Sequence, residues 1–166
     1  MPTVSLEPLE ERPELAAVLA SWAYFEWSIP IGRNWARTLE RYDPAGGEAV
    51  PRTYIAMADG APAGMASLRE RDSYDFLPGT TPWICNVYVA PAMRGFGLAG
   101  LLCRKLIDVA AEMDFSEIFL ASSLKQYSLY HRLGFRQVAE IDYFGPKYVL
   151  NLNLAARPAP AVEDGR

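Results

Sequence analysis

The sequence has few of the residues that build redox and metal sites. It contains two cysteines, Cys85 and Cys103, and a single histidine, His131. Both cysteines fall in segments expected to be regular strand or helix, so we expect free thiols in the core, as is usual in a reducing cytoplasm. No spacing of cysteine and histidine matches a metal site, and we therefore expect no metal cofactor.

Long apolar runs and an excess of basic charge are also missing. No stretch is long enough to cross a bilayer, and the N-terminal residues lack the pattern of a secretory signal. The formal net charge is −4, without the basic footprint that nucleic-acid binding requires. We therefore expect a cytoplasmic protein whose partners include neither a membrane nor nucleic acid.

Hydrophobic residues, in contrast, make up 51% of the 166-residue chain. This is enough apolar material to form a core of ordinary size. We expect a single domain over residues 1–154. Residues 155–166 are rich in proline and alanine, and we expect a flexible tail there.

Hydrophobic periodicity and turn residues divide the chain into strands and helices. The expected strands are residues 3–6, 52–58, 63–69, 82–89, 116–122, 135–143 and 147–154, and the expected helices are residues 11–27, 35–42, 97–113 and 125–133. Asp59 and Gly60 predict a hairpin turn, Asn34 is expected to cap the second helix, and Gly134 to end the fourth. This order predicts a mixed α/β fold, with a central sheet of six to seven strands and helices on both faces.

The most informative segment runs from Val87 to Gly100 and joins a strand to a helix through a glycine-rich turn. Pro91 ends the strand because proline has no N–H to donate to a β-ladder. Gly95 and Gly97 let a ligand approach the backbone closely. The first N–H groups of the following helix lack intrahelical partners, and the helix dipole favours negative charge there. The segment therefore predicts a phosphate-binding site.

Two kinds of phosphate ligand fit the glycine spacing. Gly95, Gly97 and Gly100 spell the G-x-G-x-x-G fingerprint of dinucleotide-binding proteins. The context argues against a dinucleotide, since residues 90–94 separate the strand from the first glycine. In addition, the only acidic residue of the next strand, Glu117, stands at its start rather than its end.

The same segment fits a second pattern better. The residues from Arg94 to Ala99 read R-x-x-G-x-A behind V-x-V-x-P, and the residues from Tyr130 to Phe135 read Y-x-x-x-G-F. The first motif resembles the acetyl-CoA signature of the GNAT family of N-acetyltransferases, and the second resembles a later element of that family. The two motifs occur in the expected order, and the resemblance covers roughly residues 3–154.

The resemblance implies that acetyl-CoA is the cosubstrate and binds where the strand containing Val87 separates from the strand containing Phe119. The implied binding residues are Val87, Tyr88, Val89, Arg94, Gly95, Phe96, Gly97, Leu98, Ala99, Gly100, Ser122 and Tyr127. Of the side chains in the turn, we expect Leu98 and Phe96 to point away, one into the core and one toward ligand or solvent. Ser122 departs from the family, which often has an asparagine after this strand.

The resemblance also implies a general acid, Tyr130, which would protonate the departing CoA thiolate. Tyr127 is the alternative acid, and a plain packing role is the alternative for Tyr130. For the general base we prefer Asp72, with Asp75 and Glu26 as further candidates. A solvated carboxylate that caps a turn is an equally good interpretation of the loop acids.

These features predict an N-acetyltransferase that passes an acetyl group directly to a primary amine of a small molecule or peptide. No Ser-His-Asp or Cys-His set is apparent, which favours direct attack over a covalent intermediate. The net charge is compatible with a cationic acceptor, and the protein could act as a monomer or a homodimer. The alternative hypothesis is a non-catalytic module that senses acyl-CoA.

Aromatic residues near the N-terminus are expected mainly in the core, with one or two lining the acceptor pocket: Trp22, Tyr24, Phe25, Trp27 and Trp35.

Overall fold

The computed structural model describes residues 1–43, 50, 52–72, 77–123 and 127–155, apart from the side chains of residues 127 and 128. Its centre is a seven-stranded sheet in the order β1-β2-β3-β4-β5-β7-β6. The strands are β1 (Val4–Pro8), β2 (Arg52–Ala58), β3 (Ala61–Arg69), β4 (Trp83–Val89), β5 (Glu117–Ser122), β6 (Arg136–Asp142) and β7 (Pro146–Asn153). Neighbouring strands run antiparallel except β4 and β5, which are parallel.

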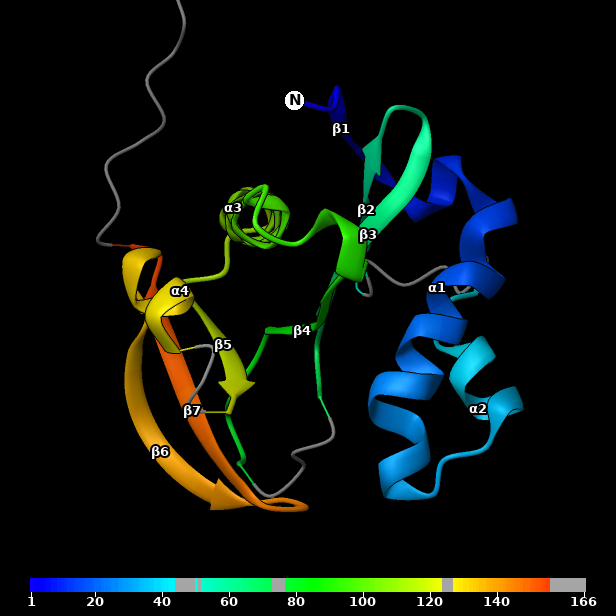
Figure 1. Ribbon diagram of the computed structural model, residues 1–166. Helices are drawn as coiled ribbons and strands as arrows, with labels where there is room; N and C mark the ends of the chain where they lie inside the picture. Colours follow the sequence, from blue (N-terminus) through cyan, green and yellow to red (C-terminus); the bar gives the residue numbers. More distant parts are fainter. Residues whose placement is uncertain (44–49, 51, 73–76, 124–126, 156–166) are drawn as a thin grey trace, which may run out of the picture.

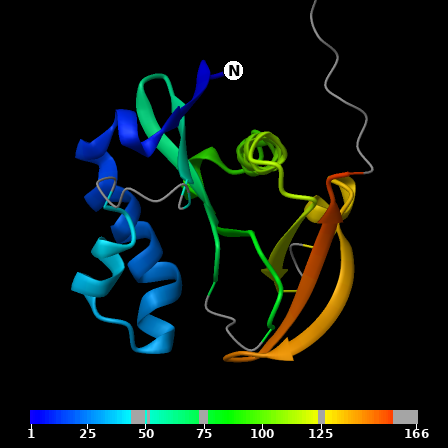
Figure 2. The ribbon, with the colours of Figure 1, turned by 180° about the vertical axis from the view of Figure 1, so that it is seen from behind.

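Four α-helices of the described residues cover the sheet. They are α1 (Ala16–Ala23), α2 (Trp35–Glu40), α3 (Leu98–Glu112) and α4 (Tyr127–Arg132). Helices α1 and α2 lie on one side of the sheet, whereas α3 and α4 lie on the other (Figure 1), and the view from behind shows the same separation (Figure 2). The mixed α/β fold with helices on both faces, as predicted from the sequence, is therefore confirmed.

Each face of the sheet has its own apolar core. Leu102 and Leu106 of α3 are fully buried against one face. Leu19 of α1 is buried against the other, beside Ile55 and Met65. Each buried side chain of this kind stabilises the fold by roughly 1.5–3 kcal/mol, so both helical layers are firmly attached to the sheet.

Local signals in the sequence set several boundaries correctly. Asp59 and Gly60 have φ values of +49° and +80°, as a tight hairpin turn between β2 and β3 requires. The Asn34 side chain accepts a hydrogen bond of 3.0 Å from the N–H of Arg37 and caps α2. The predicted tail, from residue 156 onward, lies outside the described residues.

The single helix predicted over residues 11–27 is wrong. The structure instead has a 3-10 turn at Pro13–Leu15, then α1, and then a π-helical turn over Tyr24–Ser28. A π-turn bonds i to i+5 and so offsets the residues that face the sheet. The expectation that the five aromatic residues lie mainly in the core is wrong for two of them, because Phe25 is 72% exposed and Trp35 is 40% exposed.

No helix within the described ranges combines the length and hydropathy needed to cross a membrane.

Candidate active site

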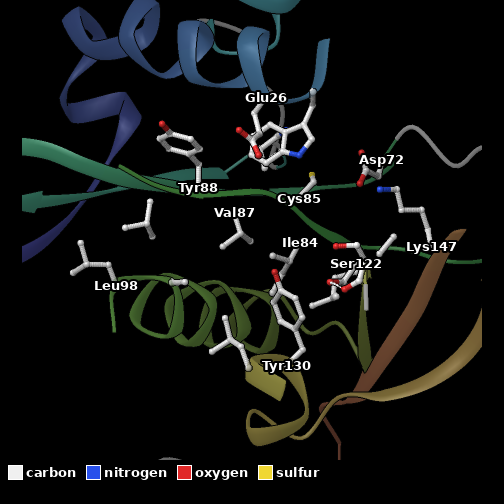
Figure 3. Close-up of a pocket in the computed structure, with 18 of the residues that line it drawn as sticks. Glu26, Asp72, Ile84, Cys85, Val87, Tyr88, Leu98, Ser122, Tyr130 and Lys147 are labelled. Carbon is white, nitrogen blue, oxygen red and sulfur yellow. Dashed lines mark hydrogen bonds between the residues drawn. The ribbon is translucent and has the colours of Figure 1, made fainter. Parts of the chain in front are cut away.

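Strands β4 and β5 separate soon after they begin. They pair at one position only, Trp83 with Phe119, where the Phe119 N–H donates to the carbonyl oxygen of Pro82 at 2.9 Å. Beyond this point the edge of β4 that faces β5 has no partner strand within the described chain. A cavity of about 910 Å³ occupies the opening (Figure 3). The strand separation implied by the resemblance is confirmed.

A β-bulge shapes the wall of this cavity. Asn86 and Val87 of β4 together face a single residue of β3, Ala66. Asn86 has a φ of +55°, a left-handed conformation that asparagine tolerates better than most residues. Its Oδ1 atom is buried and has no hydrogen-bond partner among the described residues.

The bulge also sets the direction of the neighbouring side chains. Val87 points toward α3, whereas Tyr88 points toward the N-terminal helices (Figure 3). The Tyr88 ring stacks on Trp22 with 5.0 Å between centroids and meets Trp27 edge-on at 6.4 Å. These contacts fix the π-turn against β4, so that Glu26 and Trp27 line the cavity. Among the five aromatic residues named from the sequence, only Trp27 lines it.

The glycine turn forms the opposite end of the cavity. Gly95 and Gly97 have φ values of +88° and +79°, and a Cβ added to either would meet no atom within 4 Å. Gly97 is the N-cap of α3 and makes no side-chain cap hydrogen bond. The first N–H groups of this fifteen-residue helix are thus available to an anion, with the helix dipole in its favour. The Arg94 Nε donates to the Val89 carbonyl at 3.1 Å and holds the turn against β4.

Most residues predicted to bind the cosubstrate line this one cavity: Val87, Tyr88, Val89, Arg94, Gly95, Gly97, Leu98, Ala99, Gly100 and Ser122. The Leu98 side chain is buried in the core, and the Phe96 ring is 45% exposed, which confirms that the two point away in different directions. The structure does not bring Phe96 into the cavity wall. The side chain of Tyr127 lies outside the described part of the chain.

Tyr130 enters the cavity from α4, which ends in a Schellman motif. The Phe135 N–H donates to the Tyr130 carbonyl at 3.1 Å, and the Gly134 N–H donates to the His131 carbonyl at 2.9 Å. Gly134 has the positive φ that this ending requires, +97°. The predicted helix end at Gly134 is confirmed, and it fixes the position of Tyr130 along the cavity.

The Tyr130 ring is 5% exposed and packs edge-on against Phe135, with 6.3 Å between centroids. Its hydroxyl points across the cavity toward β4, in the direction of Ile84 and Val87 (Figure 3). Burial raises the pKa of Tyr130 well above its ordinary value, so the phenol is protonated at neutral pH. It therefore presents a hydrogen-bond donor to the cavity.

Two of the three candidate bases line the cavity. Asp72 is half-buried, and its carboxylate and the amine of Lys147 point toward one another (Figure 3). Glu26 lines the cavity from the π-turn and is exposed. Asp75 lies outside the described residues. In the part of the chain that is described, no three His, Cys, Asp or Glu side chains are grouped to hold a metal ion.

Several cavity residues were not predicted from the sequence. Arg33 and Arg41 line the cavity from the two sides of α2, and Lys147 lines it from the start of β7. No local motif marks them. Asn86 did leave a signal, because asparagine is unfavourable inside a β-branched and aromatic strand and often marks an irregularity.

Solved acetyltransferase structures share this fold. The chain aligns with yncA from Salmonella typhimurium, solved with its cofactor acetyl-CoA, at a TM-score of 0.72 and 22% identity, covering 96% of this chain and 98% of that one. It aligns with aminoglycoside 6′-acetyltransferase type Ii at a TM-score of 0.69 and 18% identity, covering 94% of this chain and 99% of that one. It aligns with mutant forms of the spermidine/spermine N-acetyltransferase SpeG from Vibrio cholerae at a TM-score of 0.68 and 14% identity, covering 92% of this chain and 96% of that one.

The chain matches none of the curated proteins compared with it. The family described as "Acetyltransferase (GNAT) family" matches residues 16–135, well over half of the chain. That range includes the separated strands, the glycine turn and Tyr130. Sequence match, fold and cavity agree, and the chain belongs to the GNAT family of acetyltransferases.

Proposed function

We propose that this protein transfers an acetyl group from acetyl-CoA to a primary amine of a small molecule. The observation that carries the proposal is the opening between β4 and β5, which runs without interruption into the glycine turn before α3. Relatives solved with acetyl-CoA, or named for aminoglycoside and spermidine acetylation, support both the cosubstrate and the class of acceptor.

The residues of the cavity fit acetyl-CoA. Its pyrophosphate is anionic and suits the N–H groups between Gly95 and Gly100. Its pantetheine amides suit the unpaired edge of β4. The cavity volume, about 910 Å³, lies in the upper part of the range of small-molecule sites, roughly 300–1,000 Å³. When bound, acetyl-CoA supplies the activated acetyl group.

Backbone N–H groups around Val87 would stabilise the charge that develops on the acetyl oxygen. Such donors are effective because they are fixed before the reaction begins and need no reorganisation. The bulge at Asn86 and the pairing with β3 hold this part of β4 rigidly.

Tyr130 would donate a proton to the departing sulfur. A phenol with a raised pKa is a weak acid, but the same surroundings also disfavour a thiolate. Cys85 lines the same cavity, and burial raises the pKa of its thiol to about 12. A thiolate and a phenolate are therefore both disfavoured in this cavity, so proton transfer from the phenol to the sulfur would avoid leaving a thiolate there.

The complete transfer is balanced as follows. The amine loses a proton to a carboxylate, its nitrogen bonds to the acetyl carbon, and the C–S bond breaks with its electron pair on sulfur. Tyr130 protonates that sulfur and regains a proton that originates from the amine. Asp72 is the preferred carboxylate, and Glu26 is the alternative, because both line the cavity.

Two variants separate these candidates. If Asp72 is the base, Asp72→Asn should lower kcat/KM about 10²- to 10⁴-fold and remove the acidic limb of the pH profile. Glu26→Gln should then have little effect on either. The opposite result would assign the base to Glu26, and two unaffected pH profiles would exclude both carboxylates.

The experiment that tests the function measures thiol release from acetyl-CoA across a panel of amines, with calorimetry of CoA binding alongside. Saturable binding together with amine-stimulated release would support the proposal. No binding of acetyl-CoA would overturn it. Binding without release by any amine would favour the alternative, a non-catalytic acyl-CoA sensor.

A further inference from the structure

Basic side chains gather at the end of the cavity that receives the acceptor. Arg33, Arg41 and Lys147 line the cavity together with two carboxylates, Asp72 and Glu26, and the charges of Arg33 and Asp72 act on Arg41. Cations thus outnumber carboxylates here, although the formal net charge of the protein is −4. The overall charge and the charge of the site have opposite signs.

This end lies away from the phosphate turn. In Figure 3, Asp72 and Lys147 are at the opposite end of the cavity from Leu98. The charges of Asp72 and Arg41 also act on the thiol of Cys85, which immediately precedes the bulge in β4. Arg41, Asp72 and Lys147 therefore lie toward the Cys85 end of the cavity, not at the phosphate turn.

Arg41 is held in place by its own backbone. The Arg41 carbonyl, just after α2, accepts a hydrogen bond of 2.7 Å from Arg69 Nη2. Arg69 is 7% exposed, and its guanidinium lies 5.5 Å from the centre of the Tyr42 ring. Because this anchor is buried and rigid, the Arg41 side chain starts from a fixed point beside the cavity.

The surroundings of Arg41 are unfavourable for a lone cation. Burial lowers its pKa most, and the neighbouring charges of Arg69 and Arg33 lower it further, while Cys85 and Asp72 partly oppose them. Neither Arg41 nor Arg69 forms an ion pair with a carboxylate of the described residues. Positive charge that is partly desolvated and incompletely compensated is stabilised when an anion binds.

We propose that the acceptor is a zwitterionic amine, such as an α-amino acid, and that Arg41 binds its carboxylate. The neighbouring charge of Arg33 strengthens the positive field around that group, and the carboxylates of Asp72 and Glu26 line the same cavity. A polyamine would bring further positive charge to a site that is already basic, and should be a poor acceptor. This inference rests on the proposed acetyl transfer and specifies its substrate class.

The first arm of the test compares matched amines with the unaltered protein. L-Ornithine is set against putrescine, and L-phenylalanine against both phenethylamine and phenylalaninamide. Decarboxylation makes the amine more basic and amidation makes it less basic, yet both remove the carboxylate. If the carboxylate is recognised, both changes should raise KM, and basicity alone cannot explain the pattern.

The second arm uses Arg41→Gln, with Arg41→Lys as the conservative variant. A charge-assisted hydrogen bond lost from such a site should raise KM for the amino acid about ten- to a hundredfold. KM for acetyl-CoA and for phenethylamine should stay unchanged, and Arg41→Lys should recover part of the loss. Arg52→Gln is the matched control, since Arg52 pairs with Glu10 at 2.6 Å outside the cavity.

The outcomes separate this inference from the function on which it rests. Preference for the amino acids, lost selectively in Arg41→Gln, supports it. Acetylation of putrescine or phenethylamine in preference to the amino acids overturns it and leaves the acetyltransferase function intact. An equal rise in KM for acceptors with and without a carboxylate also overturns it. No release with any amine overturns both.

Discussion

Replacing Tyr130 with phenylalanine would remove one oxygen atom from the cavity wall and leave the ring in place. The ring packs edge-on against Phe135, and the phenylalanine keeps that contact. The Tyr130 hydroxyl makes no hydrogen bond within the described residues. We therefore expect the free energy of unfolding to change by less than about 1 kcal/mol.

The effect on catalysis should be much larger. Loss of a general acid lowers the rate about 10²- to 10⁴-fold, which corresponds to about 2.7–5.4 kcal/mol in activation free energy. The affinity for acetyl-CoA should stay the same, because the binding groups are the glycine turn and the edge of β4. The effect should therefore appear in kcat rather than in acetyl-CoA binding.

The assay is thiol release at saturating acetyl-CoA and amine, with calorimetry for affinity and thermal unfolding for stability. Tyr54→Phe is the matched control, because Tyr54 lies on β2 under the amine of Lys105, outside the cavity. Unchanged turnover in Tyr130→Phe would refute the acid assignment. A selective loss in Tyr127→Phe would transfer the role to Tyr127.

Three further predictions concern the frame of the site. Gly97→Ala should lose roughly 1 kcal/mol of stability because of the positive φ at this position, and calorimetry should show weaker binding of acetyl-CoA. Gly60→Ala is the control, since it has equal strain at φ +80° and should leave acetyl-CoA binding unchanged. In Gly64→Ala the new Cβ would lie 2.7 Å from the Tyr88 carbonyl oxygen. Urea unfolding should therefore show a decrease of about 1–3 kcal/mol in the free energy of unfolding. An unchanged free energy would mean that β4 can shift to accommodate the added methyl group. Burial raises the pKa of the Cys103 thiol from 9.0 to about 12. The folded state therefore keeps the thiol protonated over a pH range in which the unfolded state loses the proton. The resulting contribution to the free energy of unfolding is complete below pH 9 and falls by about 1.4 kcal/mol per pH unit as pH rises toward 12. Urea unfolding between pH 7.5 and 10.5 should show this decline, and Cys103→Ala should reduce it.

Local sequence signals were enough to predict most of the fold. The hairpin turn at Asp59 and Gly60, the cap at Asn34 and the helix end at Gly134 each depend on the conformational preference of one or two residues. The same holds for the glycine turn before α3, where positive φ values and a free helix N-terminus follow from neighbours in the chain. Such features need no distant contact, so they can be recognised before the fold is known.

Other features depended on distant contacts and were missed. The π-turn at Tyr24–Ser28 is stabilised where Trp27 meets Tyr88 of β4, a contact that helical periodicity does not reveal. The bulge at Asn86 arises from the register between β3 and β4. Both features decide which side chains line the cavity.

The sequence by itself therefore determined the order of the elements, the phosphate turn and the family. Only the tertiary structure decided which charged side chains line the cavity, because Arg41, Asp72 and Lys147 come from three distant segments that the sheet order brings together. The net charge of the chain, −4, is compatible with a cationic acceptor, whereas basic side chains outnumber carboxylates in the lining of the cavity. Electrostatic recognition depends on distances across the folded protein, and these distances are not contained in any local pattern.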